Sequence, residues 1–119
     1  DRSSILTFVK ETLGDKVSEV VASKKLVSHP VCLTAKGGIS FEMEKYFNAV
    51  QPDSGMKAQR VLELNMNHSA VKAMESAVQT DIEKAKKYAE LLYDQALLIA
   101  GLPIENPGEY ADVVCSLMV

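Results

Sequence analysis

Several features that would point to a particular partner are missing or scarce in this chain. It has no Trp, only 6% of its residues are aromatic, and 13 basic residues face 16 acidic ones for a net charge of −3. Such a charge balance attracts neither nucleic acid nor an anionic membrane, so we expect no nucleic-acid partner and no membrane partner. No apolar run approaches the roughly 20 residues that cross a bilayer, and the first residues have no secretory apolar segment.

Residues that would carry chemistry are also few, and they are not arranged in motifs. Cys32 and Cys115 lie far apart without a metal or redox spacing, which predicts buried free thiols in a reducing compartment, the cytoplasm. His29 and His68 have no partner at a metal-binding spacing, and the pair of glycines at 37–38 lacks the rest of a phosphate-binding loop. We therefore expect no catalytic residue, no metal and no cofactor in this chain.

Length and composition are those of a single domain. The chain has 119 residues, of which 47% are hydrophobic, and a core made mainly of aliphatic side chains and Met should suffice for one domain. Residue 1 is Asp rather than an initiator Met, so we expect the chain to be a piece of a longer protein.

The first half of the sequence predicts helices around a small sheet. Ser3 or Ser4 can cap a short helix that Gly14 ends, because glycine adopts positive φ readily. Alternating or continuous apolar residues predict strands over residues 17–27, 31–35 and 60–64. The turn at residues 28–30 contains Pro, so we expect the first two strands to form an antiparallel hairpin.

The second half predicts three consecutive helices. Their expected starts are a cap at Asn67, a capping box of Thr80 with Glu83, and Asn106 followed by Pro107. The fold class is then α+β, with a small three-stranded sheet, helices packed on it, and a C-terminal helical hairpin that forms a dimeric four-helix bundle. We expect one domain over 1–119, with an α/β part over 1–78 and dimerisation helices over 79–119.

The helical hairpin has more apolar surface than a small domain can bury. Between residues 91 and 100 only Asp94 and Gln95 are polar, and a helix that is apolar nearly all round must be covered on nearly all sides. A second copy of the chain would cover it, although a central helix wrapped by its own domain is the alternative. The expected interface contains Leu91, Leu92, Gln95, Ala96, Ile99, Ala100, Tyr110, Val113, Val114, Leu117 and Met118.

A second amphipathic helix is expected over residues 39–50. Its apolar stripe consists of Ile39, Met43, Tyr46, Phe47 and Val50. The stripe can pack on the domain's own sheet, as most such stripes do, or it can be an exposed binding surface. Flexible flanks at residues 37–38 and 52–55 favour exposure, but periodicity alone leaves both alternatives open.

Two segments resemble the carboxy-terminal domain of heat-shock-protein-90 chaperones, most closely that of the bacterial members. The first runs Arg60, Val61, Leu62, Glu63, Leu64, Asn65, Met66, Asn67, His68, Ser69. The second runs Glu90, Leu91, Leu92, Tyr93, Asp94, Gln95, Ala96, Leu97, Leu98, and Gly101, Leu102 and Pro103 follow it. The family usually has proline where Met66 and Ser69 stand here, which should loosen a turn without changing the fold.

The resemblance implies a function. It implies constitutive homodimerisation through the last two helices, with ATP and Mg bound only by upstream parts of the full-length chaperone. It places Ile39, Met43, Tyr46 and Phe47 on an exposed helix that contacts unfolded client proteins, and Val50 continues that stripe. Because the sequence ends without the family's acidic tail, it implies no docking of tetratricopeptide co-chaperones. The alternative is a small α+β ligand-binding or enzymatic domain that dimerises, which would need a pocket with converging polar groups.

Overall fold

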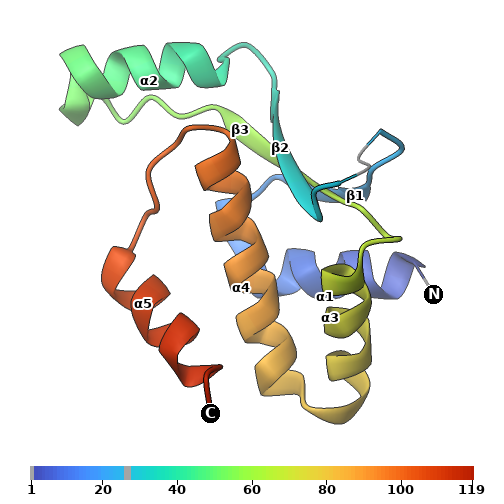
Figure 1. The fold of residues 1–119 in the computed structure, drawn as a ribbon. Helices are drawn as coiled ribbons and strands as arrows, with labels where there is room; N and C mark the ends of the chain where they lie inside the picture. The colour runs from blue at the N-terminus through green and yellow to red at the C-terminus, as the bar shows by residue number, and fades with distance from the viewer. Residues whose placement is uncertain (1, 26–27) are drawn as a thin grey trace.

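The computed structural model describes residues 2–25 and 28–119, which form five α-helices, two short 3-10 helices and three strands (Figure 1). In chain order these are α1 (Arg2–Leu13), η1 (Gly14–Lys16), β1 (Glu19–Ala22), β2 (Val31–Lys36), α2 (Phe41–Val50), η2 (Pro52–Ser54), β3 (Gln59–Leu64), α3 (Ser69–Thr80), α4 (Ile82–Ile99) and α5 (Pro107–Ser116). The predicted α+β class and the predicted order of helices and strands are confirmed.

The expected hairpin is wrong, because β1 and β2 do not pair with each other. The strand order is β1-β3-β2: β3 lies in the centre, parallel to β1 and antiparallel to β2. The physical reason is the composition of β3, in which Val61, Leu62 and Leu64 are all buried. A strand with both faces buried needs a neighbour on each edge, whereas β1 is only half-buried and suits an edge.

The first strand is also shorter than expected. It covers Glu19–Ala22 rather than residues 17–27, and residues 26–27 of that prediction lie outside the described residues. Val17 is already buried before the strand begins. The Ser18 N–H donates to the Arg60 carbonyl at 2.7 Å, so the approach to β1 is already held against β3.

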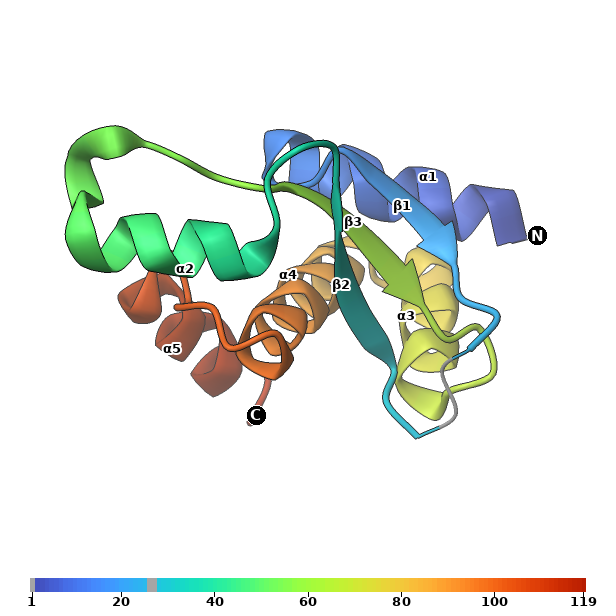
Figure 2. The same ribbon diagram turned by 90° about the horizontal axis from the view of Figure 1, so that it is seen from above.

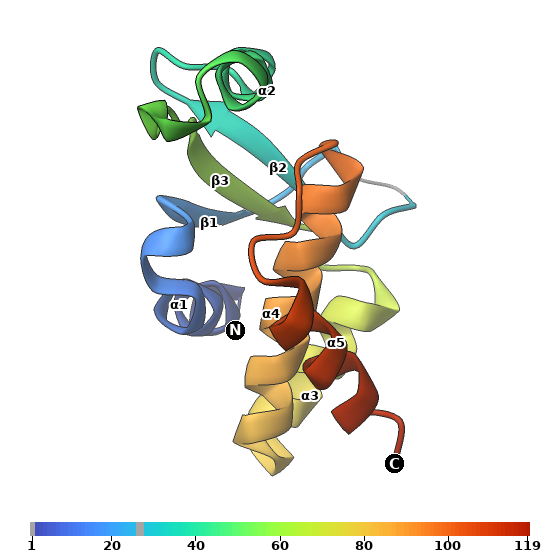
Figure 3. The ribbon, with the colours of Figure 1, turned by 90° about the vertical axis from the view of Figure 1, so that its left-hand side faces the viewer.

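The three helices α1, α3 and α4 cover one face of the sheet, as Figure 3 shows. The central helix is α4, and its buried residues are Ala85, Ala89, Leu92, Tyr93, Ala96 and Leu97. All of these except Ala85 belong to one apolar cluster with residues of α1, the sheet and α3, such as Val9, Leu62 and Met74. One core therefore joins α4 to the sheet, and α2 and α5 lie at its edges (Figures 1 and 2).

The starts of α3 and α4 are each shifted by one residue from the predicted caps. His68 rather than Asn67 caps α3, with its Nδ1 accepting a hydrogen bond from a backbone N–H two residues later at 3.0 Å. Asp81 rather than Thr80 caps α4, with a carboxylate oxygen 3.2 Å from a backbone N–H three residues later. Asp is one of the preferred cap residues, so Thr80 and Asp81 were both candidates, whereas His is not among the preferred residues and no local signal pointed to it. The cap of α5 at Asn106 is confirmed.

The start of α1 lies earlier than expected and its end is where expected. The helix begins at Arg2, so Ser3 and Ser4 lie inside its first turn rather than at the cap. Gly14 follows the last helical residue with a φ of 58°, the left-handed conformation that glycine adopts without steric penalty.

Candidate interaction surfaces

The C-terminal helix α5 adds no fully buried residue to the core. None of the described residues Pro107–Ser116 is buried. Tyr110, Val113, Val114 and Leu117 are half-buried on the side near α4, whereas Met118 is 74% exposed. Figure 1 shows α5 beside α4 and away from the sheet. An apolar helix of ten residues in this position has little to hold it folded, because short helices are marginal without packing.

The expected interface residues of α4 divide into two groups. Leu92 and Ala96 are 5% and 0% exposed in the single chain, so the chain's own core already buries them. Ile99 is 48% exposed, Gln95 is exposed, and Leu91 and Ala100 are half-buried. Leu98, which the sequence left out of the interface, is 53% exposed. The free apolar surface of α4 therefore lies at its C-terminal end.

A shallow apolar cavity extends this surface onto α3. It has a volume of about 150 Å³ and is lined by Ala70, Ala73, Tyr88, Leu91, Leu92 and Gln95. Three of these residues belong to the expected interface, and the small side chains of Ala70 and Ala73 leave the space open. The sequence did not single out α3, whose pattern of small residues was the only available signal.

The stripe on α2 faces solvent for most of its length. Tyr46 is 63% exposed, Val50 53% and Met43 44%, while Phe47 is half-buried. Ile39 is half-buried too, but it lies before α2, which Ser40 caps, so the helix begins two residues later than expected. The rings of Tyr46 and Phe47 meet edge to face, with centroids 5.7 Å apart. Figures 1 and 2 show α2 at the edge of the molecule, on the same side of α4 as α5. Of the two alternatives that periodicity left open, the structure shows the exposed one.

The buried residue of α2 is a carboxylate. Glu44 is 2% exposed, and its two oxygens accept hydrogen bonds from the Arg60 guanidinium at 2.8 and 2.9 Å. The Ala58 N–H adds a third at 2.8 Å. Burial alone would raise the pKa of the Glu44 carboxyl, but these hydrogen bonds outweigh it and lower that pKa below its ordinary value. The Phe41 ring lies 5.6 Å from the guanidinium carbon on a second side.

Sequence reasoning missed this ion pair. Glu44 lies outside the apolar stripe, and acidic residues at such positions are usually solvated. The available signal was Arg60, a charged residue next to the apolar pair Val61 and Leu62. A buried guanidinium requires a carboxylate partner, but sequence alone does not say which one.

Carboxylates also gather between α4 and α5. Glu90, Asp94, Glu105 and Glu109 line a cavity of about 200 Å³ together with Lys16. Burial, aided by the neighbouring carboxylates and opposed by Lys16, raises the pKa of Asp94 to about 6. Burial likewise raises the pKa of Glu90, again against Lys16 and with a contribution from Glu109. Ionisation in this cluster therefore works against the close approach of the two helices.

The expectation of buried thiols is wrong in its detail. Both cysteines are free, but Cys32 is only half-buried and Cys115 is exposed on α5. The reason is that α5 has no covering layer in the single chain. Within residues 2–25 and 28–119, no cluster of three or more His, Cys, Asp or Glu side chains could hold a metal ion. In the same part of the chain, no helix is long and apolar enough to cross a membrane.

A comparison with protein families decides what kind of chain this is. The family model described as Hsp90 protein matches residues 1–119, the whole sequence. The chain belongs to the Hsp90 family. The resemblance drawn from the segments at residues 60–69 and 90–98 is thereby confirmed.

Curated relatives in the Hsp90 family are about half identical to this chain. "Chaperone protein HtpG" of Oceanobacillus iheyensis is 50% identical over 100% of this chain. The proteins of the same name from Bacillus subtilis and Clostridium acetobutylicum are 48% and 47% identical over 93% and 99% of it. The chain spans only 18–19% of the length of these relatives. It is therefore homologous to one region of an Hsp90-family chaperone.

Proposed function

We propose that this chain is the dimerisation module of an Hsp90-family chaperone and that two copies associate through α4 and α5. The observation that carries the proposal is α5, an apolar helix with no fully buried residue. Exposed Leu98, Ile99 and Met118 add to its free surface. Two such helical hairpins related by a two-fold axis would form a four-helix bundle and bury the exposed apolar side chains of both copies in one interface.

The interface that this proposal requires has a known order of magnitude. A stable interface buries roughly 800 Å² per partner, and buried apolar area contributes about 25 cal/mol per Å². Exposed or half-buried apolar side chains at the end of α4 and along α5, together with the apolar cavity against α3, are the surfaces that would contribute to it. Patches of several hundred Å² are rarely left open on monomeric proteins.

Dimerisation would serve the rest of the chaperone. The upstream parts of an Hsp90-family protein bind ATP and Mg, and a dimer holds two such parts at high effective concentration. Contacts between the two arms then become intramolecular. The chain itself would contribute no catalytic residue to ATP hydrolysis, and its partners would be a second copy and unfolded client proteins.

The second part of the proposal is that α2 contacts client proteins. Met43, Tyr46 and Val50 present apolar side chains to solvent, and the flexible thioether of Met43 can adapt to many sequences. Because Glu44 anchors the helix through Arg60, these three side chains need not pack within the chain to hold it in place. Such a surface would be an aggregation liability unless it had a binding role.

The dimer is tested by sedimentation at micromolar concentration. Ile99→Lys should produce monomers, because it would bury two like charges close to the two-fold axis. A cation at the C-terminal end of α4 suits the helix macrodipole, so weaker association would not reflect a weakened helix. The matched control is Ile82→Lys, at the other end of α4, where the exposed fraction of the isoleucine is 44% against 48% for Ile99. The control should remain dimeric, and a monomeric wild type would refute the proposal.

The client surface is tested in a full-length chaperone that carries this region. A triple replacement of Met43, Tyr46 and Val50 by Ser should weaken binding of an unfolded model protein and the suppression of its aggregation. The same replacement at Ile82, another exposed apolar residue, is the control. If the triple variant suppresses aggregation as well as the wild type does, α2 is not a client surface.

A further inference from the structure

A ring of polar contacts links α2 to the connection between α4 and α5. On one side, Glu44 of α2 binds the Arg60 guanidinium and the Ala58 N–H. On the other side, the Tyr93 hydroxyl of α4 donates to Glu105 Oε2 at 2.9 Å. The two sides are joined along the chain, because the residue before Ala58 also reaches Glu105.

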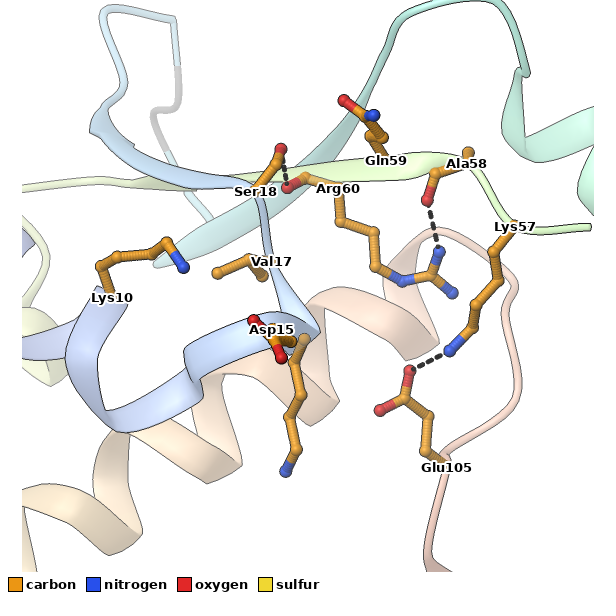
Figure 4. Close-up of a pocket in the computed structure, with 10 residues that line it drawn as sticks. Lys10, Asp15, Val17, Ser18, Lys57, Ala58, Gln59, Arg60 and Glu105 are labelled. Atoms are coloured by element: carbon orange, nitrogen blue, oxygen red, sulfur yellow. Dashed lines mark hydrogen bonds and ion pairs between the residues drawn. The ribbon is translucent and has the colours of Figure 1, made fainter.

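That joining residue is Lys57. Its Nζ lies 3.2 Å from the same Glu105 oxygen that accepts the tyrosine hydrogen bond, and Figure 4 shows this ion pair beside the Arg60 side chain. Burial strongly raises the pKa of the Tyr93 hydroxyl, the Glu105 charge adds to the rise, and the Arg60 charge opposes it. Arg60 and Glu105 line the same cavity, so the two sides of the ring face each other.

A side chain of α2 also lies close to the same connection. Lys45 Nζ lies 3.1 Å from the position that a Cβ atom on Gly101 would occupy. Gly101 has a φ of +76° in the turn that ends α4. In that turn the Leu102 N–H donates to the Leu97 carbonyl at 2.9 Å. The connection that leads into α5 thus passes close to α2 at its beginning, at Gly101. Near its end Glu105 binds Lys57, in the segment that follows α2.

The ring also borders a cavity and contains a hydrogen-bond donor without a partner among the described residues, so its contacts can rearrange. Lys57, Arg60 and Glu105 line a cavity of about 620 Å³. Arg60 is 4% exposed, and its Nε has no hydrogen-bond partner among the described residues. A buried donor without a partner beside an open cavity offers a carboxylate a second position. Glu105 is the carboxylate of the ring that borders the same cavity.

We propose that Glu44 and Glu105 are positioning residues that couple α2 to α5. Through them, the conformation of the α4–α5 connection determines how stably α2 is attached to the rest of the domain. The proposal rests on the proposed function in assigning dimerisation to α5 and client contact to α2. Dimerisation then orders the client surface through this ring, and client binding strengthens the dimer by the same factor, because coupling between two binding sites is reciprocal.

The test starts from the Glu105 end, because variants there leave the buried Glu44–Arg60 pair intact. Amide hydrogen exchange is measured residue by residue in the 119-residue chain for Glu105→Gln and Tyr93→Phe. Each should speed exchange in α2 by about two- to thirtyfold, the range of couplings carried by residues that touch neither site. Exchange in α3 should change less, which separates coupling from a general loss of stability.

The control is Lys86→Gln, which removes an exposed ion pair with Glu83, 3.4 Å long, at the start of α4 and away from the ring. It should leave exchange in α2 unchanged. Unchanged α2 exchange in both ring variants, or equal acceleration in α2 and α3, overturns the coupling. These outcomes do not depend on the oligomeric state, so a monomeric wild type would refute the dimer proposal alone.

A second test of coupling between the two carboxylates uses the double variant Glu44→Gln with Glu105→Gln. The two carboxylates bind different partners, so independent effects on α2 exchange would multiply. Coupling through the ring predicts a double variant that differs from the product of the two single effects by at least about twofold. A simple product would mean that each carboxylate acts only on its own neighbours, and the coupling would be refuted.

Discussion

Among the residues of α2, Glu44 should contribute most to the free energy of unfolding, and the exposed apolar residues should contribute little. Replacing Glu44 by Gln leaves the Arg60 guanidinium, which is 4% exposed, without a counter-charge in the interior. It also weakens the three hydrogen bonds that the carboxylate accepts. We expect the free energy of unfolding to fall by about 3–5 kcal/mol, as when one partner of a buried ion pair is removed.

The apolar residues should behave as surface residues. Tyr46 and Val50 are 63% and 53% exposed, so Tyr46→Ala and Val50→Ala should each change the free energy of unfolding by no more than about 0.5 kcal/mol. The double variant Glu44→Met with Arg60→Met is a further control. It removes both charges together, so it should be less destabilised than Glu44→Gln.

Urea denaturation followed by circular dichroism, at one fixed protein concentration, measures these differences. The difference between wild type and Glu44→Gln should narrow as the pH falls below 4.5, the ordinary pKa of this carboxyl. The folded-state pKa of Glu44 is lowered, so its contribution is present above that value and lost as the pH falls through the folded-state pKa. If Glu44→Gln costs less than about 1 kcal/mol while Tyr46→Ala costs more, the anchoring argument is wrong.

Three further outcomes are expected. The folded-state pKa of Asp94 is raised from 3.8 to about 6, so its contribution to stability is present at low pH and lost as the pH rises through about 6. Over that range the free energy of unfolding of the wild type, measured by urea titration, should fall by up to about 3 kcal/mol relative to that of Asp94→Asn. Parallel pH profiles of the two proteins would contradict this. Gly101→Ala should destabilise by more than about 1 kcal/mol in the same assay, because its φ is +76° and Lys45 Nζ lies 3.1 Å from the new Cβ; an unchanged midpoint would contradict this. Calorimetric titration of the chain with Mg-ATP should show no binding, because the sequence has no phosphate-binding motif. A saturable micromolar site would contradict this expectation.

Local patterns predicted the helices but not the order of the strands. Asn106 with Pro107, or Gly14 after an apolar helix, are signals within a few residues of one another, and both were correct. Strand pairing joins residues far apart in sequence. The turn signal at residues 28–30 suggested a hairpin, whereas β3 lies between the other two strands. The burial of Val61, Leu62 and Leu64 in β3 decided the matter, and burial is a property of the whole fold.

The same limit applies to the candidate surfaces. Periodicity identified α4 as having surplus apolar residues, but it could not say which of them meet the chain's own core. Leu92 and Ala96 proved to be core residues, and Leu98 proved to be exposed. On α2 the apolar stripe was visible in the sequence, and its anchor at Glu44 was not, because a single glutamate looks the same whether it is solvated or buried against an arginine.

The anchor explains how an amphipathic helix can leave its apolar side free. Most helices on small domains are held by their apolar stripe, which is then unavailable to a partner. Here Glu44 attaches α2 to Arg60 from a side that flanks the stripe, with Phe41 over the guanidinium, and Met43, Tyr46 and Val50 stay exposed. The attachment is directional, since it depends on hydrogen bonds rather than on buried area, so it fixes the orientation of the helix. A partner that binds the exposed part of the stripe therefore does not have to displace the bond between Glu44 and Arg60.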